Sequence, residues 1–548
     1  MMINTIVKNR SLIILFSVIV IGAFLRFYNL NWGQPFYFHP DERNIASSVS
    51  QLKFPYQMNP NFFAYGSFPI YLIHFTVTIV NFFSKAQDIF VQSIIISRFY
   101  SATLSLLIIP SIYFIGKKMW NRKIGLLSAV SSTLSVGFIQ FAHFGTFEMW
   151  LTFLGLWLFY FSYQLVKNLD LRNILIIGII FGILMATKTS SLPLIVFPFL
   201  SILLNYLLKK KSLLITLKTA IKCFVLIFSS FVVFASFSPY LFLDFDSFRN
   251  SMNYESSVAL GTLPVFYTGE FFDTIPVVFQ FIKVYPFLIN PVLTVIFIPS
   301  FIYIFFKWVK TKDSKYLILN VAYLALFLSQ AFLFAKWTRY IVPTLPFIYL
   351  ITAVSFFDFI KFLDNKKHTL FNYQYTSISL VLIVSIIFSF SYLITVFLKQ
   401  DTRVEASIWA KNNILPTSQV LSEVYDMGIV PFNQYLNSIT LFNFYDLDQI
   451  PQIKPLELNE DLEKSEYLIL PSPRILKTRL LNQEKFPYGY EFYNELINEN
   501  FGYQKIYETE CDMFCKISYL GDPAYSLEGT TNVFDRPTVF IFKNTNYR

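Results

Sequence analysis

Long apolar runs separated by short polar segments dominate the first 399 residues of the chain. A helix that spans a membrane needs about 17–25 predominantly apolar residues, and eleven runs come close to that length. A further run at residues 69–84 is apolar but short, so we expect it to lie in the membrane interface or to re-enter the membrane. The eleven predicted spans are residues 12–31, 94–115, 124–142, 149–166, 173–187, 190–208, 223–240, 286–306, 316–335, 341–360 and 376–398.

The pattern changes at about residue 400. Short apolar runs such as 467–470 and 538–542 alternate there with Pro, Asn, Asp and Gly, which is typical of strands and turns. The sequence therefore predicts a polytopic α-helical membrane protein, with about 11 transmembrane helices in a membrane domain at residues 1–399. It also predicts a soluble α/β domain at residues 400–548.

The composition agrees with this division. Hydrophobic residues make up 55% of the chain and charged residues 14%, with a mean hydropathy of +0.51, whereas a soluble protein carries about 25% charged residues. Residues 1–399 hold 31 Lys and Arg against 13 Asp and Glu, while residues 400–548 have an acidic excess. The basic excess follows the membrane region, as expected for a topology signal, and does not indicate nucleic-acid binding.

Lys and Arg residues indicate the orientation of the membrane region. They concentrate in segments that face the cytoplasm when the N-terminus is inside, such as 116–123 and 209–222, as the positive-inside rule requires. Most acidic residues of the membrane region fall on the opposite side, where two long outer loops, 32–93 and 241–285, are expected. Eleven spans then place residues 400–548 outside the cytoplasm. We therefore expect an integral membrane protein whose working surface is extracytoplasmic.

Two adjacent carboxylates, Asp41 and Glu42, follow the first span. Charged groups at membrane depth cost about 2.5–3.5 kcal/mol each and usually mark chemistry or transport. A carboxylate in a partly dry outer cavity can take a proton from a hydroxyl, which makes Asp41 a candidate base and Glu42 a candidate positioning or acceptor group. The alternative is an interfacial acid pair that Arg43 neutralises, or a helix cap after Pro40.

A second acidic site lies in the short loop from His143 to Glu148, on the same side as Asp41. Acids that converge from two loops suit an acid/base pair or a metal, so Asp41, Glu148 and His143 are candidate ligands of a divalent metal. Their spacing is not diagnostic of a metal site, and no other cofactor is predicted. The alternative is a helix start with Thr146 as cap and Glu148 in the first turn.

Cations on the outer side form a third candidate group. Lys188 lies between two spans, and Arg339 precedes another, in places where the positive-inside rule disfavours cations. A bound phosphate would explain them, because Arg offers bidentate contacts and Lys a point charge. The alternative is snorkelling or pairing with Asp244 or Asp246. The candidate substrate- or phosphate-binding residues are Lys188, Arg339, Tyr340, His39 and Tyr65.

These motifs, in this order, resemble those of the membrane glycosyltransferases of the GT-C fold. The branch is the one that contains protein O-mannosyltransferases and aminoarabinose transferases (bacterial family 39 type). Asp41-Glu42 is similar to that family's acidic motif in the first outer loop, where an Asp deprotonates the acceptor. Glu148 occupies the place of the family's second acid, which is usually Asp. Residues 66–71 (GSFPIY) resemble its Pro-Pro-Leu-Tyr segment, although they have one Pro and no preceding Lys.

Two further segments carry the resemblance. Residues 182–188 (GILMATK) resemble the segment before the family's loop Lys, and residues 339–346 resemble its Arg-Tyr-x-x-Pro-x-x-Pro motif. The resemblance covers roughly residues 1–400. It implies an inverting transfer at a bacterial plasma membrane, from a polyprenyl-phosphate-linked sugar to the hydroxyl of a glycan, lipid or protein acceptor. Asp41 would be the base, and Arg339 and Lys188 would stabilise the departing phosphate.

Two other functions are considered for such a chain. A flippase or other transporter of lipid-linked sugars is expected to place ionisable groups near mid-membrane, often in two related halves. A polysaccharide polymerase or ligase is expected to use a late outer loop rich in Arg or His, whereas the loop 241–285 has only Arg249 and Lys283.

Cys511 and Cys515 lie four residues apart in the acidic tail. A disulfide between them is one outcome if the tail lies outside the cytoplasm. Two free thiols are the other.

Overall fold

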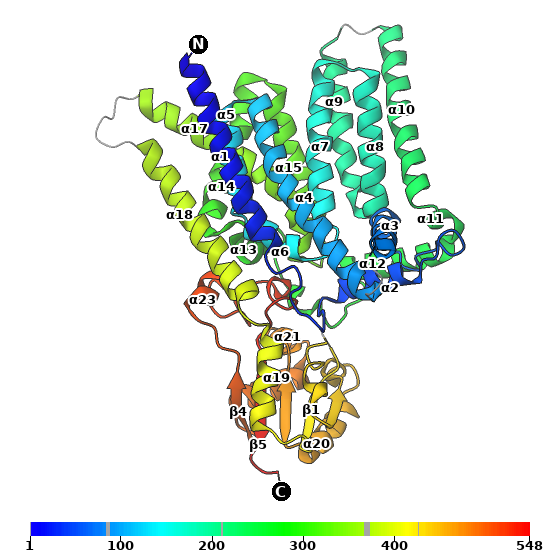
Figure 1. The fold of residues 1–548 in the computed structure, drawn as a ribbon, viewed down its shortest axis with the longest axis vertical. Helices are drawn as coiled ribbons and strands as arrows, with labels where there is room; N and C mark the ends of the chain where they lie inside the picture. The colour runs from blue at the N-terminus through cyan, green and yellow to red at the C-terminus, as the bar shows by residue number, and fades with distance from the viewer. Residues whose placement is uncertain (1, 84–87, 210–211, 366–372, 426, 548) are drawn as a thin grey trace.

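The computed structural model describes residues 2–83, 88–209, 212–365, 373–425 and 427–547 (Figure 1). Long helices form a bundle, and a smaller part that contains a β-sheet lies at one end of it. The N-terminus lies at the opposite end of the bundle from this sheet-containing part. Predictions for residues 84–87 in the outer loop 32–93, residues 210–211 in the segment 209–222, residues 366–372 between the last two predicted spans, and residues 426 and 548 in the domain 400–548 lie outside the described residues.

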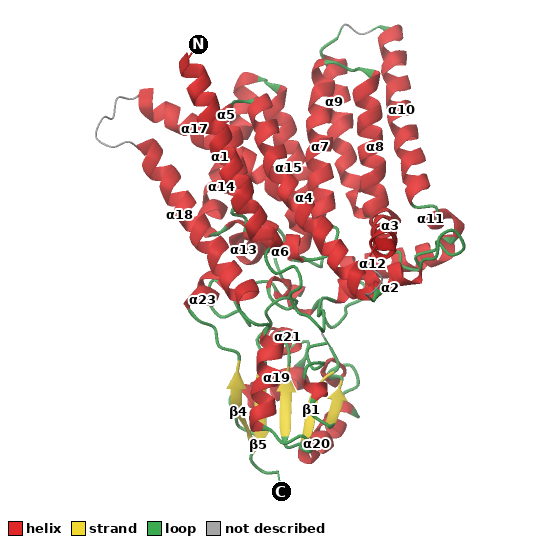
Figure 2. Cartoon of the chain, viewed as in Figure 1, coloured by secondary structure: helices red, strands yellow, loops and turns green. Residues whose placement is uncertain are grey.

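The apolar runs form the helices of the bundle (Figure 2). A helix satisfies its backbone hydrogen bonds internally, which is what an apolar membrane interior requires. The bundle helices are α1 (Met2–Phe27), α4 (Ile89–Met119), α5 (Arg122–Thr133), α6 (Val136–His143), α7 (Glu148–Lys167), α8 (Leu171–Thr187), α9 (Val196–Leu207), α10 (Leu213–Phe237), α14 (Pro291–Thr311), α15 (Ser314–Ala331), α17 (Leu345–Asn365) and α18 (Tyr373–Leu393).

Seven of the described helical segments are long and apolar enough to cross a membrane, or eight if one bent pair is counted as a single span. The predicted polytopic α-helical fold is confirmed, but the predicted number of eleven spans is not. Among the other predicted runs, Leu171–Thr187 forms a shorter apolar helix.

The bent pair corresponds to the predicted span 124–142. α5 ends at Thr133 and α6 begins at Val136, and their axes differ by 54°. The last carbonyls of a helix lack intrahelical partners, which is costly in apolar surroundings. Arg26 is fully buried and donates from Nη2 to the carbonyl of Ser132 at 2.9 Å and from Nη1 to that of Thr133 at 3.2 Å. The guanidinium thus satisfies carbonyls at the end of α5, where the bend occurs.

Short helices cover the end of the bundle that faces the sheet (Figure 1). The run 69–84 forms α3 (Ser67–Phe83), which packs against α2 (Pro40–Gln51) in one apolar cluster. α2 begins with a proline, whose fixed φ suits the first helical position, and both predicted acids lie in its first turn. The remaining short helices at this end are α11 (Tyr240–Leu243), α12 (Phe245–Leu260), α13 (Tyr285–Ile289) and α16 (Thr338–Ile341).

A mixed five-stranded sheet with flanking helices forms the C-terminal part, as the sequence predicts (Figure 2). The strand order is β2-β1-β3-β5-β4; β1 pairs in parallel with β2 and β3, while β5 is antiparallel to β3 and β4. The strands are β1 (Gln419–Glu423), β2 (Ser438–Phe442), β3 (Tyr467–Leu470), β4 (Tyr503–Glu508) and β5 (Phe540–Asn544), and the helices are α19 (Thr402–Asn413), α20 (Lys454–Lys464), α21 (Arg474–Leu481), α22 (Pro487–Ile497) and α23 (Met513–Tyr519).

The sheet has an apolar core on each face. Successive side chains of a strand point to opposite faces. In β3, Leu468 and Leu470 belong to one cluster of buried residues, and Tyr467 and Ile469 belong to the other. A continuous apolar run therefore fits a strand that is buried on both sides.

A disulfide joins Cys511 to Cys515 at the start of α23. Of the two outcomes that the spacing leaves open, the structure has the bonded one.

We expect Arg26→Met to destabilise the bundle by about 3 kcal/mol, because each buried group left without a partner costs about 1–3 kcal/mol. Denaturant titration of the purified protein in micelles measures this loss. Lys123→Met, an exposed position near the start of α5, is the matched control and should stay near wild type. Equal stability of the two variants would contradict the role of Arg26.

Candidate active site

A cavity of about 400 Å³ lies where the short helices at this end of the bundle meet the C-terminal part. Its walls come from α2, the segment before α3, α12, the α16 region and loops of the C-terminal part. A smaller pocket shares Lys188, Arg339 and Tyr340 with this cavity and reaches leucines of the bundle. The charged residues that line the larger cavity are Asp41, Lys188, Glu255, Arg339 and Arg474.

Asp41 and Arg339 form an ion pair in this cavity. Arg339 Nη1 lies 2.5 Å from Asp41 Oδ2, and each side chain is a little over one-fifth exposed. The Tyr65 hydroxyl donates to the same carboxylate oxygen at 3.0 Å and accepts from Arg339 Nη1 at 3.2 Å. Three predicted site residues, distant in the sequence, therefore meet at one oxygen atom.

Lys188 and Glu148 lie beside this group. Lys188 Nζ is 3.5 Å from Glu148 Oε1, and it lies over the rings of Tyr65 and Tyr340 at 4.9 and 5.6 Å from their centroids. Glu148 is buried, and its two oxygens accept no hydrogen bond from the described part of the chain. The predicted residues Lys188, Glu148 and Tyr340 thus join Asp41 and Arg339 around one site.

A close backbone contact brings Tyr65 to Lys188. The Gly66 N–H donates to the carbonyl of Thr187 at 2.9 Å. A Cβ atom at position 66 would lie 2.0 Å from the carbonyl oxygen of Ala186, so only glycine allows this approach. The residues on either side of the contact, Tyr65 and Lys188, therefore face the same cavity.

The Glu42 side chain does not face the cavity that its neighbour Asp41 lines. It is completely buried, with Arg98 Nη2 2.6 Å from Oε2 and Arg98 Nε 2.9 Å from Oε1. The Gly145 N–H also donates to Oε1 at 2.6 Å. The buried pair fixes α2 against α4, so Glu42 holds the helix that presents Asp41 rather than lining the cavity.

The two predicted histidines also lie outside the cavity wall. His39 is buried between the rings of Phe144 and Phe534, and burial lowers its pKa despite the nearby acids. Both ring nitrogens of His143 lie 2.8 Å from backbone carbonyl oxygens, which leaves neither for a metal. The predicted metal candidates Asp41, Glu148 and His143 therefore do not assemble, and the described residues contain no cluster of three metal-binding side chains.

Two charged residues of the cavity are absent from the predictions. Glu255 comes from α12, and Arg474 comes from the start of α21 in the C-terminal part. Arg474 also lies over the rings of Phe266 and Phe534, at 5.9 and 5.3 Å. Glu255 falls in the predicted outer loop 241–285, which is a weak signal for a site residue, whereas no local pattern connects position 474 to the membrane region.

The charges of the cavity shift the pKa of its carboxyl groups. Burial acts to raise the pKa of Asp41, but the Arg339 guanidinium, together with other nearby cations and the Tyr65 hydroxyl, holds it below its ordinary value. Burial raises the pKa of Glu255 even though Arg339 and Lys188 oppose the shift. The pKa values of Asp41 and Glu255 thus shift in opposite directions within one cavity. In enzymes, such a difference between two carboxyl groups accompanies different acid and base roles.

Comparison with protein families supports the motif-based resemblance. Residues 80–242 match the family described as dolichyl-phosphate-mannose-protein mannosyltransferase. This match confirms that the chain is similar to membrane glycosyltransferases of the protein mannosyltransferase type. No curated protein sequence matches the chain.

The chain is also similar in fold to solved structures of membrane enzymes. One is the archaeal oligosaccharyltransferase AglB from Archaeoglobus fulgidus in complex with an inhibitory peptide and a dolichol-phosphate. Its TM-score is 0.48 at 13% identity, over 98% of this chain and 88% of that chain. Another is ArnT from Cupriavidus metallidurans bound to undecaprenyl phosphate, with a TM-score of 0.44 at 11% identity over 87% and 94% of the two chains.

We expect Arg98→Met to destabilise the protein by about 3–5 kcal/mol, because removing one partner leaves the other charge buried and unpaired. The double variant Glu42→Leu/Arg98→Met should recover part of that loss. Denaturant titration in micelles measures both variants, with Lys53→Met, at an exposed position just after α2, as the control. A single Arg98→Met variant as stable as wild type would contradict a fixed position for α2.

Proposed function

We propose that this integral membrane protein is a glycosyltransferase that moves a sugar from a polyprenyl-phosphate-linked donor to an acceptor hydroxyl. The observation that carries the proposal is the Asp41–Arg339 pair, a candidate base and a candidate phosphate ligand in one cavity. The matching family is described by a lipid-linked donor, dolichyl-phosphate-mannose, which supports the donor class. The adjoining pocket has leucine side chains in its wall, and these suit the lipid portion of such a donor.

The proposed reaction is a single inverting displacement. The acceptor oxygen attacks the anomeric carbon, and a new C–O bond forms. The bond from that carbon to the phosphate oxygen breaks, and its electron pair leaves with the phosphate. Asp41 takes the acceptor proton as general base, while Arg339 and Lys188 stabilise the charge that develops on the leaving phosphate.

The ion pair suggests how donor and base are coupled. Arg339 holds the pKa of Asp41 down, which makes the carboxylate a weak base while the pair is intact. A donor phosphate competes for the same guanidinium, because phosphate and carboxylate are both bidentate partners of Arg. In this proposal, donor binding draws Arg339 from Asp41 and raises the basicity of the carboxylate when a sugar is available.

The remaining cavity residues have supporting roles in the proposal. Glu148 holds Lys188 beside the phosphate through their 3.5 Å ion pair. The rings of Tyr65 and Tyr340 lie next to the Lys188 ammonium, which favours the charged form by cation–π attraction. Glu255 lies in the cavity wall, where its carboxyl oxygens can accept hydrogen bonds from sugar or acceptor hydroxyls.

We propose an extracytoplasmic position for the cavity and for the C-terminal part. The Cys511–Cys515 disulfide supports this side, because disulfides persist in oxidising compartments. The N-terminus lies at the opposite end of the bundle (Figure 1), in agreement with a cytoplasmic N-terminus.

Asp41→Asn is expected to lower transfer at least about 100-fold, because a positioned general base contributes about 10²–10⁴-fold. Mass spectrometry of extracellular glycans, lipids and proteins from cells with and without the gene identifies the product. The purified variant is then assayed for formation of that product. Asp246→Asn, an exposed acid in the first turn of α12, is the control and should retain activity. Full activity of a folded Asp41→Asn protein would sink this mechanism.

Membrane-impermeant maleimide should label Lys464→Cys in intact cells, since this exposed residue lies in the C-terminal part. The free thiol of Cys223 is first replaced by serine. Lys123→Cys, in the predicted cytoplasmic segment 116–123, should react only after the cells are opened. The reverse labelling pattern would place the cavity on the cytoplasmic side.

A further inference from the structure

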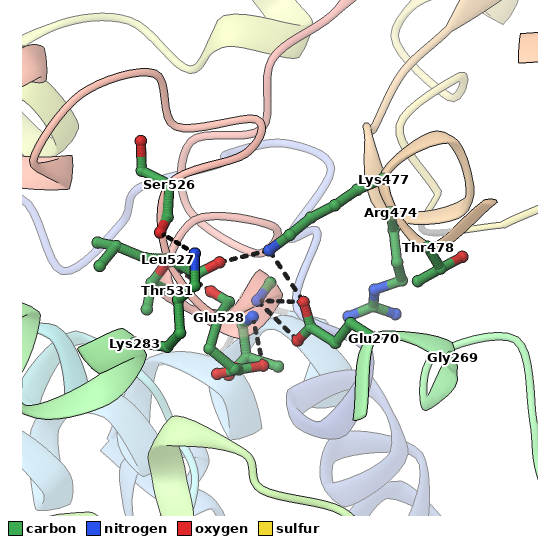
Figure 3. Close-up of polar contacts among 12 residues, drawn as sticks. Gly269, Glu270, Lys283, Arg474, Lys477, Thr478, Ser526, Leu527, Glu528 and Thr531 are labelled. Carbon is green, nitrogen blue, oxygen red and sulfur yellow. Dashed lines mark hydrogen bonds and ion pairs between the residues drawn. The ribbon is translucent and has the colours of Figure 1, made fainter. Parts of the chain in front are cut away.

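A buried charged cluster joins the C-terminal part to the membrane region directly behind Arg339. Figure 3 shows Glu528 and Glu270 side by side, with Lys477 reaching toward them from α21. The Glu528 side chain contacts Thr338, the residue before Arg339, so this cluster adjoins the proposed phosphate site.

Glu528 holds Thr338 through two hydrogen bonds to one oxygen. The Thr338 backbone N–H donates to Glu528 Oε2 at 2.9 Å, and the Thr338 hydroxyl donates to the same oxygen at 2.6 Å. Glu528 is 1% exposed and Thr338 is fully buried. These two hydrogen bonds fix the position of the Thr338 backbone.

The position of the Thr338 backbone determines the position of the Arg339 backbone, which follows it directly. α16 (Thr338–Ile341) is a single turn, and the first N–H groups of a helix have no partner within it. Glu528 supplies the partner for the first of them. Because Arg339 is the next residue, a shift of this turn moves its guanidinium relative to Asp41.

The loop that carries Glu528 is itself held by two elements. Glu270 Oε1 accepts from the Gly529 N–H at 2.9 Å, and Lys477 Nζ lies 2.9 Å from Glu270 Oε2. Lys477 also donates to the carbonyl of Leu527, and Lys283 Nζ donates to that of Ser526 at 2.8 Å (Figure 3). The loop therefore cannot move independently of the outer segment 269–283 or of α21.

The buried carboxyl groups of Glu528 and Glu270 have shifted pKa values. Burial first, and then the adjacent charge of Glu270, raise the pKa of Glu528 to about 7. Burial also acts to raise the pKa of Glu270, but the Lys477 ammonium and the hydrogen bonds it accepts hold it below its ordinary value. Two buried carboxyl groups are unfavourable for stability alone, and the turn that they hold is the one that carries Arg339.

We propose that Glu528 is a positioning residue, through which the C-terminal part sets the place of Arg339 in the cavity. The role of Arg339 as a phosphate ligand rests on the proposed function. The hydrogen bonds that hold its turn do not. The two can therefore be tested by separate measurements on the same protein.

The test compares Glu528→Gln with a matched control, Asp535→Asn. Asp535 is also a buried carboxyl group of the C-terminal part that contacts the bundle, where it accepts from Gln140 Nε2 at 3.1 Å and from the Tyr392 hydroxyl at 2.5 Å. These partners lie on α6 and α18 rather than on α16. Both substitutions replace a buried carboxyl group by an amide of similar volume, so a general loss of interface stability affects both variants.

The first measurement is amide hydrogen exchange of residues 336–342 in full-length protein in nanodiscs. Loss of the charged acceptor should increase exchange at Thr338 and Arg339 about tenfold in Glu528→Gln, with less than a twofold change in Asp535→Asn. Unchanged exchange in Glu528→Gln, or an equal increase in both variants, would overturn the proposal. This result does not depend on any ligand.

The second measurement is the affinity of the same proteins for undecaprenyl phosphate. Glu528→Gln should bind this probe about tenfold more weakly than wild type, and Asp535→Asn should bind it within twofold. In an Arg339→Met background, Glu528→Gln should add less than a further twofold, because residues that act through one another are not additive. A full tenfold loss in that background would overturn the proposal. Wild-type protein that fails to bind the probe would count against the proposed donor class, and the exchange result alone would then decide the role of Glu528.

Discussion

The ion pair between Asp41 and Arg339 is the contact on which the arrangement of the cavity depends. Its partners are 298 residues apart in the sequence, on α2 and α16. Each partner stands on an element that is fixed by a buried charge: α2 by Glu42 with Arg98, and α16 by Glu528. Because such charges are costly to bury, these contacts tolerate little displacement. The distance between Asp41 and Arg339 therefore depends on both supporting contacts.

The C-terminal part contributes to the cavity as well as to its support. Arg474, Thr530 and Phe534 lie in the cavity wall, and Glu528 reaches the turn of Arg339. Phe266, in the segment between α12 and α13, stacks on Tyr425 with ring centroids 3.9 Å apart. The cavity is thus closed by two parts of the chain that the hydropathy pattern separates at about residue 400.

Local sequence patterns predict the elements of this protein better than their long-range contacts. The apolar runs locate the helices, and alternating runs locate β3 and β5, because these signals depend on neighbouring residues. The motifs also identify Asp41, Lys188 and Arg339. By contrast, nothing near Glu42 in the sequence indicates that it pairs with Arg98. Likewise, nothing near His143 indicates that backbone carbonyls contact both of its ring nitrogens. The bend between α5 and α6 and the cavity residue Arg474 depend on contacts across more than one hundred residues, which periodicity does not encode.

The first turn of α2 directs two adjacent acids into different surroundings. Successive side chains on a helix point about 100° apart, so Asp41 faces the cavity while Glu42 faces the protein interior. An activity assay alone would not distinguish loss of one acid from loss of the other, since loss of Asp41 removes the cavity partner of Arg339 and loss of Glu42 releases the helix that carries Asp41. A survey of variants that scores folding and turnover separately would distinguish Asp41 from Glu42. Substitution at position 42 would be limited by its buried partner, Arg98.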